Sequence, residues 1–275
     1  FKPVDSSNGP WVVIDEVAMQ AGKENKFELT AEGSVVVSIV TVTSPGEGRL
    51  KLEFTREGPQ NRISWGFKCA QDEHFMGFGA QTWDVDHRGQ TVQAWVQEQG
   101  IGKVEHDEYT GAWYLTGRRH SSHIPIPEYL SSRGYIATVD TGVRATFALC
   151  SDTPDISRIE FEAPAAIHIF YGPEPKKALE KATEEFGRPR MPPDFAFAPW
   201  LDAIYGSDNV RSVAQRLREY GIPSSAIWTE DWRGTSWDGD NYVLEEEWEL
   251  DRSLYPDFEE LASDLHDMGF KFLVY

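Results

Sequence analysis

The apolar residues of this 275-residue chain change their spacing near residue 171. Before that point they form short alternating or β-branched runs, such as 33–44, 50–58 and 144–151, and glycine, proline, asparagine and aspartate separate the runs. Short alternating runs between turn residues are typical of antiparallel sheets packed face to face. The first part of the chain is therefore predicted to be an antiparallel β-sandwich.

After residue 171 the spacing alternates between helical and strand-like segments. Helices are predicted where apolar residues recur every three or four positions and a glycine ends the segment, over 174–187, 207–221 and 255–269. Apolar strands are predicted within 191–206, 224–231 and 270–275. From residue 191 on, the order strand, helix, strand, helix, strand begins a parallel α/β unit.

Each predicted helix has an apolar face that would pack inward. The inward residues are Ala178, Leu179, Ala182 and Phe186 in the first helix, Val210, Val213, Leu217 and Tyr220 in the second, and Phe258, Leu261, Leu265 and Met268 in the third. Ser207 is predicted to cap the second helix, and Gly221 to end it.

These patterns predict two domains, a β-sandwich with a connecting helix at 1–190 and the beginning of an α/β unit at 191–275. The last strand, 270–275, would have no covering helix and would leave an open parallel sheet. Tyr275 is therefore expected to be a truncation point.

Composition excludes several partners. The 45 Asp and Glu residues against 26 Lys and Arg give a net charge of −19, which repels nucleic acid phosphates and anionic membranes. No apolar run is long enough to span a bilayer. The histidines lack the spacing of a zinc site, so no metal or cofactor is expected. Cys69 and Cys150 are compatible with one disulfide or with two buried thiols.

The segment 227–234, IWTEDWRG, places Glu230 and Asp231 where a predicted strand ends, with Trp228 and Trp232 on either side. In parallel α/β folds, functional groups gather at the carboxyl ends of the strands. Carboxylates accept hydrogen bonds from sugar hydroxyls, and indole faces pack against sugar rings. The pattern favours a sugar site, and the alternative is a solvated charge pair beside two core tryptophans.

Four segments resemble, in order and spacing, those of glycoside hydrolase family 31, the retaining α-glycosidases. They are 75–95, 171–193, 222–232 and 255–275. The forms WxxDWxG at 228–234 and WVQEQGIGK at 95–103 are most similar to the branch with the sulfoquinovosidases. The resemblance implies a β-sandwich followed by a (β/α)8 barrel, of which this chain holds the first three strands, and an α-linked oligosaccharide or glycoside as the partner.

The resemblance also implies where the chemistry occurs. In this family the nucleophile is an aspartate after barrel strand 4, and the acid/base is an aspartate after strand 6. Both would lie beyond Tyr275, so no catalytic residue is expected within the chain. Retention needs two carboxyl groups about 5–5.5 Å apart across the glycosidic bond. Neighbours such as Glu230 and Asp231 point to opposite faces of a strand, so they are expected to bind sugar and not to cleave it.

The candidate sugar ligands differ in their expected roles. Glu230 matches the family position that holds substrate hydroxyls, and its alternative is an ion pair with Arg233. Asp231 is expected to orient the loop by accepting backbone hydrogen bonds. Asp202, at the end of the preceding strand, is a further ligand candidate, and a helix cap or loop bond explains it nearly as well. Trp228, Trp232, Glu98 and Gln99 complete the substrate-binding candidates.

The resemblance also indicates whether the glycone, the sugar that the enzyme recognises, is charged or neutral. In the sulfoquinovosidases an arginine and a tryptophan after strand 2 read the sulfonate, and an ungapped count places Val243 and Glu246 there. Glu230 matches the branch's strand-end glutamine. Carboxylates repel a sulfonate, so a neutral sugar, or an amino sugar paired with Glu246, is expected. An approach of Arg233 or Arg252 from another direction would oppose this expectation.

A second class of function stays open, a non-catalytic carbohydrate-binding or assembly protein with a degenerate barrel. The acidic composition and the absence of a first methionine favour a periplasmic or extracellular bacterial protein. Assembly into a homo-oligomer is left open by the sequence.

Overall fold

The computed structural model describes residues 11–31, 35–97 and 119–275. The chain forms two compact units, Phe1–Arg188 and Pro189–Tyr275. Each unit has its own hydrophobic core.

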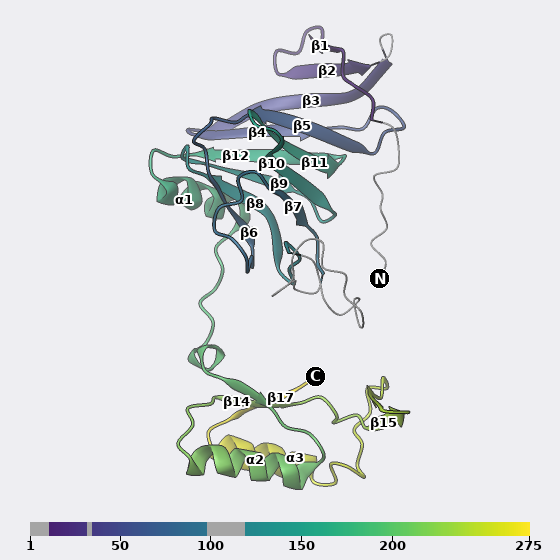
Figure 1. The fold of residues 1–275 in the computed structure, drawn as a ribbon, viewed down its shortest axis with the longest axis vertical. Coiled ribbons are helices and arrows are strands. Elements are labelled where there is room, and N and C mark those ends of the chain that lie inside the picture. The colour runs from purple at the N-terminus through teal and green to yellow at the C-terminus, as the bar shows by residue number, and fades with distance from the viewer. Residues whose placement is uncertain (1–10, 32–34, 98–118) are drawn as a thin grey trace. The chain divides into compact units, whose positions relative to one another are not determined.

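The first unit is mostly sheet, as the alternating pattern predicts (Figure 1). An eight-stranded sheet has the order β1-β2-β3-β4-β12-β9-β8-β6, and a four-stranded sheet has the order β5-β11-β10-β7. All of the pairings within these sheets are antiparallel. The strands are β1 (Glu16–Met19), β2 (Lys26–Ala31), β3 (Val35–Gly46), β4 (Arg49–Phe54), β5 (Arg62–Lys68), β6 (Phe75–Gly79), β7 (Thr91–Ala94), β8 (Pro125–Ser131), β9 (Tyr135–Asp140), β10 (Ala145–Thr153), β11 (Ile156–Glu162) and β12 (Ala165–Tyr171).

Aromatic side chains from the two sheets meet in the core of this unit. Phe54 of β4 contacts Phe161 of β11 with ring centroids 5.0 Å apart. Phe78 of β6 contacts Phe147 of β10 at the same separation, 5.0 Å. Both contacts are edge-to-face, the arrangement that aromatic quadrupoles favour. Burial of these rings holds the two sheets face to face.

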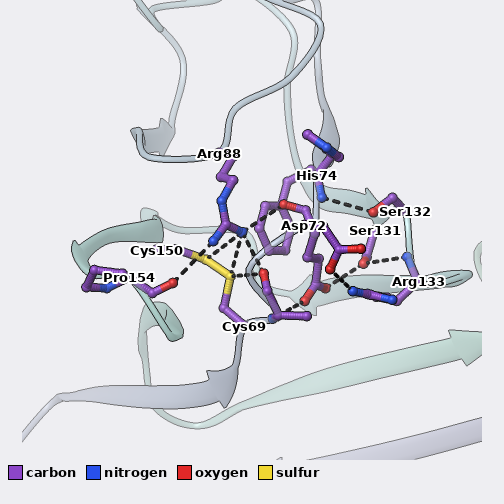
Figure 2. Close-up of a disulfide and its surroundings, with 12 residues drawn as sticks. Cys69, Asp72, His74, Arg88, Ser131, Ser132, Arg133, Cys150 and Pro154 are labelled. Carbon is purple, nitrogen blue, oxygen red and sulfur yellow. Dashed lines mark hydrogen bonds and ion pairs between the residues drawn. A yellow bond between two sulfur atoms is a disulfide. The ribbon is translucent and has the colours of Figure 1, made fainter.

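A disulfide joins Cys69, which follows β5, to Cys150 of β10 (Figure 2). Of the two alternatives compatible with the sequence, the structure therefore has the bridged one. The Arg88 guanidinium lies beside the sulfurs and donates to the carbonyls of Ala70 (2.9 Å), Glu73 (2.8 Å) and Pro154 (3.2 Å). The disulfide and Arg88 together fasten segments that are far apart in the sequence.

Helix α1 (Pro175–Phe186) closes the first unit. It buries Ala178 and Ala182 beside Ile136 and Phe170 of the eight-stranded sheet. Leu179 is 50% exposed, which differs from the prediction that it packs inward, whereas Phe186, although 46% exposed, packs its ring on Phe170 at 6.0 Å between centroids. The helix contacts the sheet through one narrow stripe, so only the two alanines are fully covered.

The second unit is a parallel sheet with helices packed against it (Figure 1). The sheet order is β13-β14-β17, with Asp202 opposite Trp228 and Ile227 opposite Phe272. Val210, Ala214 and Leu217 of one helix and Leu261 and Leu265 of the other form a core with Ile227. The elements are η2 (Asp194–Phe197), β13 (Trp200–Asp202), α2 (Ser207–Glu219), β14 (Ala226–Thr229), β15 (Thr235–Asp238), β16 (Asn241–Leu244), α3 (Phe258–Asp267) and β17 (Lys271–Val274).

Three details of the second unit differ from the sequence predictions. Gly206, not Ser207, is the residue before α2, and Ser207 makes no capping hydrogen bond. Tyr220 is 74% exposed because the helix has already ended, and Gly221 reverses the chain with a φ of +64°. β13 is an edge strand, so Trp200 and Asp202 are exposed instead of buried.

We expect the disulfide to contribute about 2–4 kcal/mol to the free energy of unfolding, because it closes a long loop, with a sequence separation of 81 between its cysteines. Urea denaturation with and without dithiothreitol measures this contribution. The double variant Cys69→Ala/Cys150→Ala is the control, and its midpoint is expected to be low and insensitive to the reductant. An equal midpoint for all samples would contradict the prediction.

Candidate functional site

The carboxyl ends of β13 and β14 bring Asp202, Glu230 and Asp231 together. Asp202 is exposed as a residue, but partial desolvation of its carboxyl, followed by the charge of Asp231, raises its pKa above the usual range. Burial, followed by the charges of Asp202 and Asp231, raises the pKa of Glu230. The three carboxylates therefore lie near enough to repel one another, and this end of the sheet is strongly electronegative.

Asp231 is 0% exposed and accepts hydrogen bonds from three elements. The Thr229 hydroxyl donates to Oδ1 at 2.7 Å, and the Tyr205 backbone N–H donates to Oδ2 at 2.7 Å. The buried Tyr255 hydroxyl, from the segment before α3, also donates to Oδ1. Burial, followed by this bond, raises the pKa of Tyr255, so the phenol keeps its proton. Asp231 has no surface left for a ligand and holds the loops in place.

The bond from Tyr205 to Asp231 fixes a backbone conformation that few side chains adopt. Tyr205 has a φ of +70°, in the left-handed region, and is followed by Gly206 with a φ of +91°. Such a conformation in a non-glycine residue costs of the order of 1 kcal/mol and persists where the surroundings hold it. The Asp231 carboxylate is one of the groups that hold it.

Glu230, in contrast, has no hydrogen bond or ion pair among the residues that the structure describes, although its side chain is half-buried. Arg233 does not pair with it. The Arg233 guanidinium donates to the Glu246 carbonyl at 3.1 Å and lies 5.1 Å from the Trp248 ring centroid. The carboxylate of Glu230 is thus a free acceptor at the carboxyl end of the sheet.

Both predicted tryptophans contact Tyr275, the residue that follows β17. Trp228 contacts the ring of Tyr275, which follows β17, at 5.7 Å between centroids. The Trp232 indole donates to the Tyr275 carbonyl at 2.7 Å and packs edge-to-face on Trp248 at 5.7 Å. Both tryptophans keep part of their surface exposed.

Tyr242, which the sequence does not single out, lies near the carboxylates of Glu230 and Asp231. It lies in the β15–β16 hairpin, between the strand predicted at 224–231 and the helix predicted at 255–269. Its ring contacts Tyr205 at 6.4 Å and Trp237 at 5.7 Å between centroids. Burial, followed by the charges of Asp231 and Glu230, raises the pKa of Tyr242. An available signal was the Asp238-Gly239 pair between short strand-like runs, which is typical of a hairpin turn.

The remaining predictions concern two loop residues, a metal site and a membrane span. Glu98 and Gln99 lie outside the described residues, so their role stays a prediction. Within the described ranges, no group of three His, Cys, Asp or Glu side chains is arranged to hold a metal ion. The same ranges contain no helix with the length and apolar character needed to cross a membrane.

Comparison with known proteins gives one match to a protein family. Residues 189–275 match the glycosyl hydrolases family 31 TIM-barrel domain. The curated relatives include a sulfoquinovosidase of Agrobacterium fabrum, 28% identical over 86% of this chain and 38% of its own length. An α-xylosidase of Lactiplantibacillus pentosus is 27% identical over 94% of this chain and 31% of its own length. The chain thus spans about a third of the length of these relatives.

Solved structures share the fold. A family 31 sulfoquinovosidase from E. rectale superposes with a TM-score of 0.75 at 22% identity, covering 96% of this chain and 39% of that one. A family 31 dextranase from Flavobacterium johnsoniae gives a TM-score of 0.63 at 18% identity, covering 94% of this chain and 30% of that one.

We expect Asp231→Ala to lower the free energy of unfolding by about 2–4 kcal/mol, because it leaves the Tyr255 hydroxyl and the Tyr205 N–H buried without their acceptor. The neighbouring change Glu230→Ala is the matched control, and it should shift stability by less than about 0.5 kcal/mol since Glu230 has no described partner. Chemical denaturation compares the two. Equal losses would refute the division of roles between these carboxylates.

Proposed function

We propose that this chain, which is related to glycoside hydrolase family 31 and within it to the sulfoquinovosidases, is part of an enzyme that hydrolyses α-glycosidic bonds with retention. Residues 1–190 would be its β-sandwich domain and residues 191–275 the first three strands of its (β/α)8 barrel. The family match at 189–275 and the parallel order β13-β14-β17 support this assignment. The names of its curated relatives, a sulfoquinovosidase and an α-xylosidase, support glycoside hydrolysis.

The observation that carries the proposal is that the Glu230 carboxylate is half-buried and has no partner among the described residues. A half-buried carboxylate without a described partner costs free energy that a ligand would return by donating hydrogen bonds. Sugar hydroxyls are such donors, and Trp228 and Trp232, which flank the Glu230–Asp231 pair in the sequence, keep part of their surface exposed. Glu230 is therefore assigned as the acceptor for glycone hydroxyls. Asp202, exposed at the end of β13, is assigned as a second acceptor.

The chain binds and positions the sugar, and the chemical step belongs to other carboxylates. Retention requires two carboxyl groups about 5–5.5 Å apart on opposite sides of the glycosidic bond. Asp231 is saturated by hydrogen bonds, so it is not available as a nucleophile. The family resemblance implies aspartates after barrel strands 4 and 6 for these roles. Interactions of Glu230 that strengthen in the transition state would contribute to the rate.

The glycone is proposed to be neutral, not sulfoquinovose. Three neighbouring carboxylates create a field that repels a sulfonate. Two arginines follow β14 in the chain, and neither bonds to Glu230 among the described residues, although the Arg233 Nε has no partner there. Arg252 forms a bidentate pair with Glu259 at 2.6 and 2.8 Å, and Arg233 donates to Glu246.

Glu230→Ala in the full-length enzyme is expected to lower kcat/KM by about 2–4 kcal/mol of transition-state stabilisation, since a charge-assisted hydrogen bond is lost from a desolvated site. Steady-state kinetics on the preferred α-glycoside measure the loss. Glu260→Ala, on the exposed face of α3, is the matched control and should leave kcat/KM unchanged. If Glu230→Ala reduces the melting temperature but not the activity per folded molecule, Glu230 is structural.

A panel of aryl glycosides tests the glycone. 4-Nitrophenyl α-sulfoquinovoside is compared with the α-glucoside, the α-galactoside, the α-xyloside and the N-acetyl-α-galactosaminide. We expect one of the uncharged substrates to have the highest kcat/KM, because the carboxylates repel the sulfonate. The fragment 1–275 alone is the control and should turn over none of them. A preference for the sulfonated substrate would overturn the neutral glycone.

The same panel tests the second class of function. A non-catalytic carbohydrate-binding or assembly protein would bind sugars and hydrolyse no member of the panel, even as the full-length chain. Turnover by the fragment 1–275 would contradict the assignment of the chemical step to other carboxylates.

A further inference from the structure

A second polar group near Glu230 lacks a partner. The Tyr242 hydroxyl oxygen is buried and makes no hydrogen bond among the described residues. A buried hydroxyl without a partner costs about 1–3 kcal/mol, and native proteins contain few of them. Such a group calls for an explanation by something that binds it.

Two aromatic rings pack against the Tyr242 ring. Trp237, its direct partner across the hairpin, packs against it at 5.7 Å between centroids, and Tyr205 packs on it at 6.4 Å. The backbone N–H of Tyr205 is itself bound to Asp231, the residue next to Glu230. The ring therefore lies one side chain away from the loop that carries the free carboxylate.

The base of the hairpin is tied to that same loop. The Glu245 N–H donates to the Gly234 carbonyl at 3.1 Å, and the Gly234 N–H donates to the Asp231 carbonyl at 2.9 Å. Beyond the hairpin, the Asp251 N–H donates to the Trp232 carbonyl at 3.0 Å. The position of Tyr242 relative to Glu230 is thus set by backbone bonds and not by a free loop.

Tyr242 and Glu230 offer complementary hydrogen bonding. Burial and the neighbouring carboxylates keep the pKa of Tyr242 high, so its hydroxyl remains a donor at neutral pH. An ionised Glu230 only accepts. No hydrogen bond joins the two in the described structure, and the polar atoms of a ligand would satisfy both.

We propose that Tyr242 is a specificity-determining residue, whose hydroxyl donates a hydrogen bond to a hydroxyl of the sugar that Glu230 holds. This inference rests on the proposed function and names a second contact in its site. A site built to bind a substrate hydroxyl rejects an analogue that lacks it, because the buried groups of the site are then left unpaired. Tyr242 would therefore select for one particular ring hydroxyl.

Tyr242→Phe in the full-length protein tests the proposal, because it removes a single oxygen. The substrates are the neutral α-glycoside that the wild type hydrolyses fastest and its monodeoxy analogues. For the parent glycoside we expect kcat/KM to fall about 10- to 100-fold. For one deoxy analogue, which lacks the bonded hydroxyl, wild type and variant should have equal kcat/KM. The melting temperature should be unchanged or higher, because an unpaired buried hydroxyl is removed.

Tyr220→Phe is the matched control, since Tyr220 lies exposed after α2, and it should behave as wild type on every substrate. If Tyr242→Phe retains wild-type kcat/KM on the parent glycoside, or loses the same factor on all analogues, the proposal is overturned. A lowered melting temperature with unchanged activity per folded molecule also overturns it. Absence of turnover by the wild type contradicts the proposed function itself, whereas an active wild type with an equally active variant contradicts only the role of Tyr242.

Discussion

The buried carboxylate of Asp231 joins three segments that the sequence separates. It receives the backbone N–H that follows β13, the hydroxyl of Thr229 at the end of β14, and the hydroxyl of Tyr255 before α3. A carboxylate with several charge-assisted hydrogen bonds is strongly held, and its loss leaves buried donors without an acceptor. One side chain therefore ties these three segments together at this end of the parallel sheet.

The adjacent carboxylates of Asp231 and Glu230 thus differ in burial and in hydrogen bonding. Asp231 is saturated and fully buried, whereas Glu230 is half-buried and has no partner in the described chain. Burial, followed by the charges of Asp202 and Asp231, raises the pKa of Glu230. A protein gains nothing in stability from that arrangement, and functional sites are where such costs are tolerated. Tyr242, with its unpaired buried hydroxyl, fits the same reasoning.

Regular elements were predictable from the sequence where local chemistry decides them. The apolar spacing of α2 and α3 and the reversal at Gly221 follow from helix geometry, and each is present. The N-terminus of α2 was not predictable, because Gly206 adopts a positive φ and Ser207 is drawn into the helix. The disulfide was undecidable since spacing alone does not give the distance between Cys69 and Cys150. The sequence did not indicate Tyr242, because its environment depends on tertiary contacts, and the hairpin that carries it lies in an acidic segment.

A crystal structure of the full-length protein with its product sugar tests the central claim most directly. The account predicts that Glu230 accepts from one glycone hydroxyl, and that the Tyr242 hydroxyl donates to another polar atom of the same ring. Asp231 should keep its three protein donors and make no contact with the sugar. A sugar bound elsewhere, with Glu230 and Tyr242 still unpartnered, or a sugar held directly by Asp231, would contradict the account.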